Sequence, residues 1–416
     1  MSDWKEYKLG ELVAVNERSI GRNFNFEEIE YIDTSSVTEN KFELPSFITL
    51  KDAPSRAKRL IRDGDTIIST VRPVQKHYGY IKKSKENQVV STGFAVVTPK
   101  KIESRFLYYF LSQPEITEYL NTIAEGGTTT FPAFRAEEIN DLNIKLPDNY
   151  TQTAIADILS SLDDKIELNN KINKELETLA QTLFKQWFID FEFPNENGEP
   201  YKSSGGEMIE SELGEIPMGW RVNTIESLTE KMNSGGTPST RRDDYYDGNI
   251  KWFSTKELKD SYLFESERMI SQAGLDNSSA KVFPVNTVLM AIYAAPTVGR
   301  LGILTEEATF NQAALGFIAK EEVGFEYVFL LLKHLRDDLN NLANGAAQQN
   351  LNVGLVKNYN TVHPTYDLLS SFRQIVSPLF LSIKINQEET NTLKFTRDNL
   401  LPKLISGELE INEISN

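Results

Sequence analysis

The sequence of 416 residues is built from two similar halves offset by about 217 residues. The segment W-K-E-Y-K-L-G-E-L at Trp4 is matched by W-R-V-N-T-I-E-S-L at Trp220. D-T-I-I-S-T-V and A-E-G-G in the first half are answered by N-T-V-L-M-A-I and A-N-G-A in the second. Each half reaches a proline, Pro147 or Pro364, and then enters a long helical pattern. Two copies of one domain plus one helix suit a partner that must be held at two places.

Each copy combines strand and helix signals. D-T-I-I-S-T-V and F-A-V-V-T-P are short β-branched runs bounded by Gly and Pro, whereas R-F-L-Y-Y-F-L-S-Q-P and E-I-T-E-Y-L have helical spacing. The second copy follows with strands at T-V-L-M-A-I-Y and A-L-G-F-I-A and a helix at Y-V-F-L-L-L-K-H-L. The mixture predicts an α+β domain with an irregular, loop-rich sheet.

The segments after the two prolines carry a heptad pattern in which apolar residues step by alternating fours and threes. The first seam comprises Ile155, Leu159, Leu162, Ile166, Asn169, Asn173, Leu176, Ala180, Leu183 and Trp187. The second comprises Phe372, Val376, Leu379, Ile383, Asn386, Thr390, Leu393, Arg397, Leu400 and Leu404. The fold class predicted is α+β, with two tandem pseudo-repeated domains separated by two long helices that form an antiparallel coiled coil.

Polar residues fall in the same layers of both seams. A seam Asn costs stability but fixes register, so we interpret Asn169 and Asn386 as devices that pair two specific helices. The alternative is that each helix packs only on its own domain. Pro378 is expected to start or kink the second helix. Residues 191–219 are rich in Gly, Pro, Ser and Glu and are interpreted as a connector that leaves the second domain free to dock.

Composition limits the possible settings and partners. The absence of cysteine excludes disulfides and thiolate metal sites, and no apolar run approaches the roughly 20 residues of a membrane span. With no export signal at its start, the chain is expected to be cytoplasmic, without a membrane partner. The net charge of −16 argues at first against nucleic acid, yet residues 51–85 hold ten Lys or Arg against three Asp. That stretch predicts a local cationic face, and a solvated loop surface is the alternative.

Several strings resemble one known family. G-G-T-P-S-T-R-R-D-D-Y-Y-D-G-N-I-K-W-F-S-T-K-E-L from Gly235, then A-A-P-T-V-G-R-L-G-I, F-N-Q-A-A and N-G-A-A-Q-Q-N-L-N, resemble the target-recognition domains of type I restriction-modification specificity subunits. A-I-A-D-I-L-S-S-L-D-D-K-I-E-L-N-N and F-K-Q-W-F-I-D-F-E-F-P resemble the central helix of these subunits and the segment after it. The first domain matches more loosely, with T-V-R-P-V-Q-K-H-Y-G-Y in place of A-I-Y-A-A-P-T-V-G-R-L-G-I, as expected for a domain that reads a different half-site.

The resemblance implies a specific division of the chain and a specific role. The segments would be target-recognition domain 1 (1–147), a central conserved helix (148–190), a linker (191–219), target-recognition domain 2 (220–364) and a C-terminal conserved helix (365–410). Such a subunit binds double-stranded DNA at a split sequence, one half per domain. Two methyltransferase (M) subunits grip its helices and methylate adenine, and restriction/translocase (R) subunits can join. The chain itself would have no catalytic residue, no metal and no cofactor.

The sequence contains no recognisable catalytic or metal-binding motif. The sequence has no phosphate loop, no H-E-x-x-H and no G-x-G-x-x-G between a strand and a helix. His77, His334 and His363 lie far apart, so no metal site or triad is indicated. Two alternatives remain: a two-domain scaffold that assembles partners through its coiled coil without binding DNA, and an enzyme acting on an extended polymer. The second is disfavoured because no acid, base or metal group is assembled.

Side chains that read DNA are expected on loops, and residues 72–78 follow a predicted strand and so should lie on one. Direct readout uses Arg or Lys on guanine, Asn or Gln on adenine, and hydroxyls or apolar groups at thymine. In the first domain the candidates are Arg72, Gln75, Lys76, His77, Tyr78, Thr128, Thr129 and Thr130, with Lys58, Arg59 and Arg62 as phosphate contacts. In the second domain they are Thr237, Thr240, Arg241, Arg242, Tyr293, Arg300, Gln348, Gln349 and Asn350. For each single residue, solvated surface is the alternative. Trp252 is expected to be core.

Overall fold

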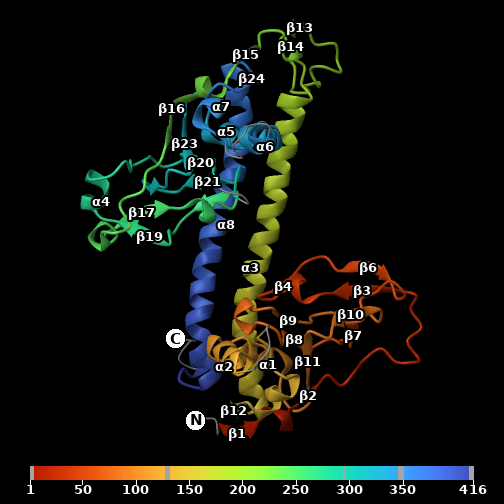
Figure 1. Cartoon of the computed structure of the whole chain (residues 1–416). Helices are drawn as coiled ribbons and strands as arrows, with labels where there is room; N and C mark the ends of the chain where they lie inside the picture. The colour runs from red at the N-terminus through yellow and green to blue at the C-terminus, as the bar shows by residue number, and fades with distance from the viewer. Residues whose placement is uncertain (1–3, 127–131, 294–296, 345–350, 412–416) are drawn as a thin grey trace. The chain divides into compact units, whose positions relative to one another are not determined.

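The computed structural model describes residues 4–126, 132–293, 297–344 and 351–411, and it divides into two compact units (Figure 1). Unit 1 comprises Met1–Glu167 and Asn391–Asn416, and unit 2 comprises Leu168–Thr390. Each unit therefore contains part of both long helices, α3 (Asn149–Phe184) and α8 (Tyr366–Ser406). The sequence-based boundaries instead treated the helices as segments separate from the domains.

Unit 1 is built on two four-stranded sheets. The first has the order β2-β11-β8-β9, with all neighbours antiparallel, and consists of β2 (Val13–Val15), β11 (Phe94–Pro99), β8 (Thr66–Ser69) and β9 (Tyr78–Tyr80). The second has the order β6-β3-β10-β7 and consists of β6 (Ser46–Thr49), β3 (Glu28–Ile32), β10 (Gln88–Ser91) and β7 (Ala57–Leu60). Unit 1 also has two separate two-stranded sheets, β1 (Lys5–Lys8) with β12 (Asn143–Leu146) and β4 (Val37–Thr38) with β5 (Lys41–Phe42).

Unit 2 repeats this topology. Its main sheet has the order β16-β23-β20-β21-β18, formed by β16 (Thr229–Ser234), β23 (Ala314–Ala319), β20 (Val288–Ala291), β21 (Leu301–Leu304) and β18 (Ser261–Leu263). Its second sheet has the order β19-β17-β22, formed by β19 (Arg268–Ile270), β17 (Ile250–Phe253) and β22 (Thr309–Phe310). The pair β15 (Arg221–Thr224) and β24 (Asn360–His363) matches β1 and β12. The internal repeat predicted from the sequence is therefore a repeat of structure.

The strands and helices predicted in each copy are confirmed. All four residues of β8 and all four of β20 are buried, which is why these runs are almost wholly apolar or hydroxylic. The helical pattern after β11 forms α1 (Ser104–Leu111) and α2 (Pro114–Glu125). The helical pattern after β23 forms α5 (Phe325–His334), followed by α6 (Arg336–Asn344). Two short helices, α4 (Gln272–Asp276) and α7 (Val353–Lys357), have no counterpart in the prediction.

Every seam position of α3 and α8 is buried or half-buried, as the heptad pattern requires. Within unit 2, Asn386 Nδ2 donates to Asn173 Oδ1 at 2.9 Å, and Asn169 Nδ2 donates to Glu389 Oε2 at 2.7 Å. Partner numbers fall along α8 as they rise along α3, so the two segments of this unit run in opposite directions. The side-chain partner of Asn386 is thus Asn173, while Asn169 meets a carboxylate. That these asparagines select the register stays a prediction.

Pro378 was expected to start or kink the second helix, and it does not start it. Helix α8 begins at Tyr366 and continues through Pro378 as one helical segment. Proline removes one backbone hydrogen bond and leaves the carbonyl of Gln374 without its helical donor. Both residues are exposed, so water can solvate that carbonyl.

One stretch of α8 is long and apolar enough to cross a membrane by length and composition alone, which the search for unbroken apolar runs did not indicate. Some apolar residues of α8 are exposed, namely Ile375, Leu381 and Ile385, and others are buried. Phe372, Val376, Phe380 and Ile383 belong to the core of unit 2, where they pack with residues of α5. This part of α8 therefore buries apolar side chains within unit 2.

Residues 191–219 are not a free connector, so that interpretation needs correction. Strands β13 (Met208–Ser211) and β14 (Gly214–Pro217) form a hairpin within this segment. The ring of Phe193 stacks on Tyr201 at 4.5 Å and on Trp220 at 5.3 Å, measured between ring centroids. Ile216 is also buried in the core of unit 2. The Gly and Pro content marks turns in a packed segment rather than a flexible tether.

Candidate nucleic-acid interface

The first candidate loop leaves the sheet of unit 1 between β8 and β9. Pro73–Gln75 form one turn of 3₁₀ helix, and the flanking residues Arg72 and Lys76 have φ angles of 48° and 54°. A left-handed conformation costs a non-glycine residue roughly 1–2 kcal/mol. Arg72, Gln75 and Lys76 are exposed. Two strained cationic residues on an exposed loop are typical of a functional site, where the surrounding structure maintains the strain.

The structure joins this loop to the segment after Thr128, Thr129 and Thr130, which form the second candidate loop of the first domain. Arg72 N donates to the carbonyl oxygen of Pro132 at 2.9 Å, and Phe134 N donates to that of Thr70 at 3.0 Å. Thr128, Thr129 and Thr130 lie outside the described residues. Both predicted loops of unit 1 are therefore connected to the same end of β8, although 50 residues or more separate them in the sequence.

Unit 2 has the same arrangement at the end of β20. Ile292 N donates to Ala313 O at 2.8 Å, as Thr70 N donates to Gly93 O at 2.8 Å in unit 1. Leu351 N then donates to Ile292 O at 3.1 Å, which repeats the bond from Phe134 to Thr70. Tyr293 and Arg300, the candidates on this loop, are half-buried, and Gln348, Gln349 and Asn350 lie outside the described residues. Thr70 and Ile292 therefore each make the same two backbone hydrogen bonds, and we call this shared arrangement the frame of the candidate loops.

A third loop of unit 2 begins at Gly235 and approaches the same frame. Gly235 N donates to Ala314 O at 3.2 Å and Gly236 N to Phe310 O at 2.9 Å. A Cβ atom at either glycine would overlap backbone atoms of Phe310 or Ser279, so only glycine fits. The core role expected of Trp252 is confirmed, since it is buried and its Nε1 donates to Gly236 O at 2.9 Å.

The candidates on this third loop differ in how they are held. The hydroxyl of Thr237 donates to the side-chain oxygen of Gln312, a residue of the F-N-Q-A-A string that the sequence reading did not select. Arg242 forms an ion pair with Asp244 at 2.8 Å and lies over the ring of Tyr245 at 4.8 Å. Thr240 and Arg241 are exposed. Gln312 could have been found from the match of its string to the family.

In unit 1, the candidates Lys76, His77 and Tyr78 of the first loop have contacts within the unit. Lys76 Nζ lies 2.9 Å from Glu39 Oε1, and His77 Nδ1 lies 2.6 Å from Val37 O and 3.1 Å from Thr38 Oγ1. Tyr78 is half-buried against Tyr108, and burial raises the pKa of its hydroxyl to about 12. Arg72 and Gln75 are exposed.

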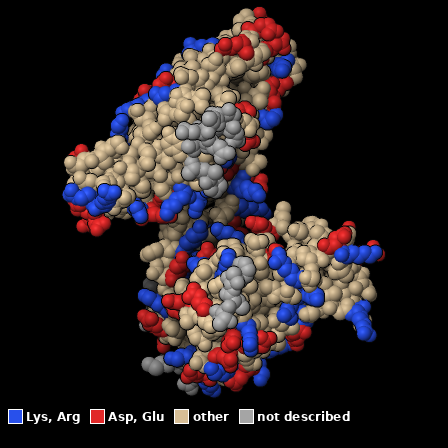
Figure 2. All heavy atoms as spheres, viewed as in Figure 1, with Lys and Arg blue, Asp and Glu red and all other residues tan. Residues whose placement is uncertain are grey.

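The cationic stretch 51–85 is less cationic in space than in sequence. At least five of its ten cations form ion pairs with acidic residues from elsewhere in unit 1 or from the stretch itself, namely Arg56, Arg62, Lys76, Lys82 and Lys85. On the face drawn in Figure 2, Lys and Arg are interspersed with Asp and Glu over unit 1. Of the three phosphate candidates, Lys58 is exposed, Arg59 is half-buried, and Arg62 is 3.7 Å from Asp65 and 3.9 Å from Glu17. The stretch predicted to form a local cationic face therefore contributes several cations that are paired with acidic side chains.

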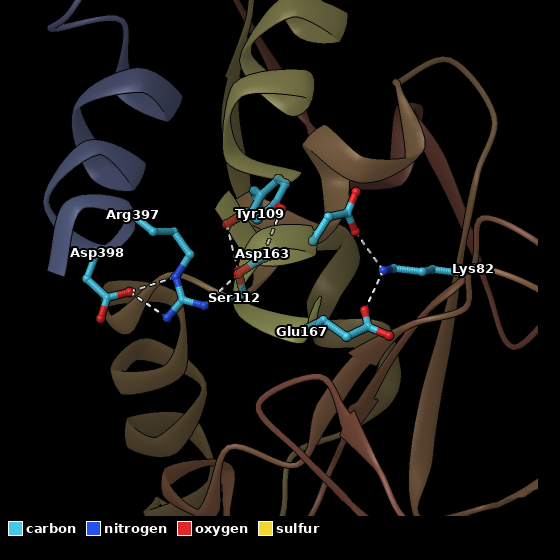
Figure 3. Close-up of polar contacts among 8 residues, drawn as sticks. Lys82, Tyr109, Ser112, Asp163, Glu167, Arg397 and Asp398 are labelled. Atoms are coloured by element: carbon cyan, nitrogen blue, oxygen red, sulfur yellow. Dashed lines mark hydrogen bonds and ion pairs between the residues drawn. The ribbon is translucent and has the colours of Figure 1, made fainter. Parts of the chain in front are cut away.

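The strand that follows the first loop is tied to the long helices of unit 1. Lys82, just after β9, forms ion pairs with Asp164 and Glu167 of α3, each at 2.8 Å. Asp163 on α3 accepts hydrogen bonds from Tyr109 at 2.8 Å and from Arg397 of α8 at 2.7 Å (Figure 3). A pocket of about 440 Å³ lies beside these contacts, and Lys82, Tyr109, Asp163, Asp164, Tyr80 and Asn40 are among the residues that line it. The loop is thereby built on the same part of unit 1 that holds α3 and α8 together.

The described residues contain no group of three or more His, Asp or Glu side chains placed to hold a metal ion. His363 is buried in β24, where desolvation lowers its pKa to about 4. Desolvation also lowers the pKa of His334, which lies beside Phe184 at 6.1 Å. Both histidines are placed by packing within unit 2, and His77 belongs to unit 1.

Comparison with known proteins agrees with this duplicated arrangement. The family described as type I restriction modification DNA specificity domain matches residues 1–178 and again residues 217–394. The type I restriction enzyme HindI specificity subunit of Haemophilus influenzae is 30% identical over 98% of this chain and all of that protein. The MjaIX specificity subunit of Methanocaldococcus jannaschii is 27% identical over 99% of this chain and 89% of that protein.

A solved structure, described as a type I restriction-modification system S subunit from M. genitalium, shares the fold. Its TM-score is 0.61 with 14% identity, and the match covers 97% of this chain and 96% of that one. The two matched segments of the family description together cover most of the sequence and contain both candidate loop frames. The chain therefore belongs to the type I restriction-modification DNA specificity family and is a specificity subunit that recognises DNA.

Proposed function

We propose that this specificity subunit reads a bipartite DNA site, with one half contacted by the loops of unit 1 and the other by the loops of unit 2. The observation that carries this proposal is the repeated frame, in which Thr70 and Ile292 each make the same two backbone hydrogen bonds. Loops with one scaffold and different side chains suit the reading of two different short sequences. Adenine is the base that partner subunits would methylate, and the chain itself performs no chemistry.

The two long helices are proposed to form an antiparallel coiled coil that positions the partner subunits. In support, Leu168 and Ile385 are equivalent positions of the repeat, 217 residues apart, and they are 50% and 54% exposed. Leu381 and Ile172 add to the exposed apolar residues on these helices. Exposed aliphatic residues on helices suit docking of partner helices. We assign these surfaces to two methyltransferase subunits, with restriction/translocase subunits joining the complex in the cytoplasm.

The paired substitution Arg72→Ala and Lys76→Ala tests the proposal against the scaffold alternative. Both side chains lie on the first loop, outside the helical seams. A DNA reader loses selective binding to its site while assembly with the methyltransferase subunits, followed by size-exclusion chromatography, is preserved. A scaffold without a DNA role loses neither. Retention of full selectivity by the assembled variant complex would contradict the assignment of this loop.

A further inference from the structure

The short hairpin β4–β5 holds the first candidate loop from the side. Its strands are joined by the two residues Glu39 and Asn40, whose φ angles of 45° and 64° are both positive, as in a type I′ turn. Asn-Gly is the favoured sequence for such a turn, and glutamate is a poor choice because its side chain disfavours the left-handed conformation. Glu39 therefore occupies its position at a cost that the turn alone does not explain.

The contacts of Glu39 explain that cost. Its backbone N–H donates to the carbonyl oxygen of Lys76 at 2.9 Å, and its carboxylate accepts a hydrogen bond from Lys76 Nζ, also at 2.9 Å. One residue thus holds both the backbone and the side chain of Lys76. The neighbouring Asn40 donates from its backbone N–H to Tyr78 O at 2.9 Å, so two successive residues of the hairpin turn bind the backbone of residues 76–78.

Unit 2 provides an internal comparison. Asp260 corresponds to Asn40, since it also has a positive φ of 58° and its N–H donates to Leu301 O, the counterpart of Tyr78 O. The residue that corresponds to Lys76 is Gly299, with a φ of 80°. Lys76 precedes His77, whose carbonyl accepts a hydrogen bond from Ser69 at the end of β8, and Gly299 precedes Arg300, whose carbonyl accepts one from Ala291 at the end of β20. The residue before Asp260 is Lys259, not an acid. Where unit 2 uses glycine, unit 1 uses a strained lysine and places a carboxylate beside it.

We propose, on the basis of the function proposed above, that Glu39 is a positioning residue which holds Lys76 in its left-handed conformation and so fixes how the 72–78 loop meets one half of the DNA site. Glu39 acts through Lys76 and does not itself contact a base. An acidic residue beside a phosphate-binding surface repels DNA, so a bystander at this place would weaken binding. Its hydrogen bond with Lys76 lowers the pKa of Glu39, and the nearby Lys41 and Arg397 lower it further, so the carboxylate is charged at neutral pH.

The two possibilities predict opposite results for Glu39→Gln. If Glu39 is a bystander, removing one negative charge from among several cations tightens DNA binding and leaves sequence selectivity unchanged. If Glu39 positions Lys76, the loop loses its fixed conformation and discrimination falls. The loss is confined to the half-site read by unit 1, because unit 2 has no equivalent of this ion pair. The second half-site therefore serves as a control within each DNA molecule.

The test uses the full chain, restored as wild type or variant to a host strain from which its gene has been deleted, with methylated adenines mapped across the genome. For Glu39→Gln we expect about a tenfold rise in methylation at sites with one mismatch in the unit 1 half, and no change in the other half. Glu43→Gln, which removes the same charge from the same part of unit 1, should leave both halves unchanged. In a Lys76→Gly background, Glu39→Gln should add nothing, because a positioning residue has no effect once its target is absent.

Three results would overturn the inference. One is unchanged selectivity of Glu39→Gln in both halves, another is an equal loss in both halves, and the third is a full additional effect in the Lys76→Gly background. A wild-type genome without any split methylated motif would overturn the proposed function itself, and is recognised before any variant is compared.

Discussion

Asn386 of α8 donates a hydrogen bond from its Nδ2 to Oδ1 of Asn173 on α3, at 2.9 Å, within unit 2. Asn173 is buried, and its own Nδ2 donates to the carbonyl oxygen of Ile383 at 3.3 Å. Both bonds depend on one alignment of the two helices. A slip by one residue would separate the pair, so we expect this contact to favour one register of the two helices.

The substitution Asn386→Ala is expected to destabilise unit 2. It leaves Oδ1 of Asn173 buried without a donor, which costs about 1–3 kcal/mol. The measurement is the thermal unfolding midpoint of the full chain. Leu381→Ala on the same helix is the control, because Leu381 is exposed in the free chain and its loss should change stability by less than about 0.5 kcal/mol. Equal midpoints for Asn386→Ala and the control would show that the pair does not stabilise the helices.

Phe193→Ala tests whether residues 191–219 are part of the folded unit. The ring is buried between Tyr201 and Trp220, and removal of a buried Phe ring typically costs about 3–5 kcal/mol. We expect faster proteolysis within 191–219 and a lower unfolding midpoint. Leu213→Ala, at an exposed position of the β13–β14 turn, should change neither. A free connector would be cleaved equally fast in the wild type and in Phe193→Ala.

Stability is expected to depend on pH through His363. Its pKa is about 4 in the folded chain and about 6.5 when unfolded, so the unfolded state binds the proton first as pH falls. The histidine-dependent part of the stability is therefore fully present above about pH 6.5 and is lost between that value and about pH 4, amounting to about 3 kcal/mol. Denaturant unfolding of wild type and His363→Gln over this range measures it. Parallel pH profiles for the two proteins would contradict the assignment.

DNA binding by the isolated chain is expected to be weak, because the chain carries a net charge of −16 and at least half the cations of its basic stretch are already paired. The complex with methyltransferase subunits should bind tightly with a steep salt dependence. Within that complex, Lys58→Ala should lower the slope of log affinity against log salt by about 1 without changing selectivity. Nanomolar, sequence-selective binding by the isolated chain at physiological salt would contradict this account.

Much of the fold could be predicted because it depends on local patterns. Short, largely apolar runs placed β8, β11, β20 and β23, which are buried along most of their length, and helical spacing placed α1 and α5. The same reasoning placed both heptad seams on the buried faces of α3 and α8. Helix starts were harder, because Pro378 is tolerated where water can reach the carbonyl that it leaves unpaired.

The candidate interface was only partly predictable, because its geometry depends on contacts between distant segments. The 72–78 loop does follow a strand, as predicted, but the pairing of Lys76 with Glu39 and of Thr237 with Gln312 joins residues 37 and 75 positions apart. Charge counts along the sequence could not show that Lys82 and Lys85 meet carboxylates folded next to them. Glycine and proline counts likewise hid the packing of Phe193 on Trp220.

Mapping methylated adenines in the host genome, with and without this gene, tests the central claim most directly. The account predicts a split motif with two short specific halves and a spacer of constant length, present in the wild type and absent after deletion. A continuous motif, a motif with a single specific half, or a methylation pattern unaffected by deletion would contradict the assignment of one half-site to each unit.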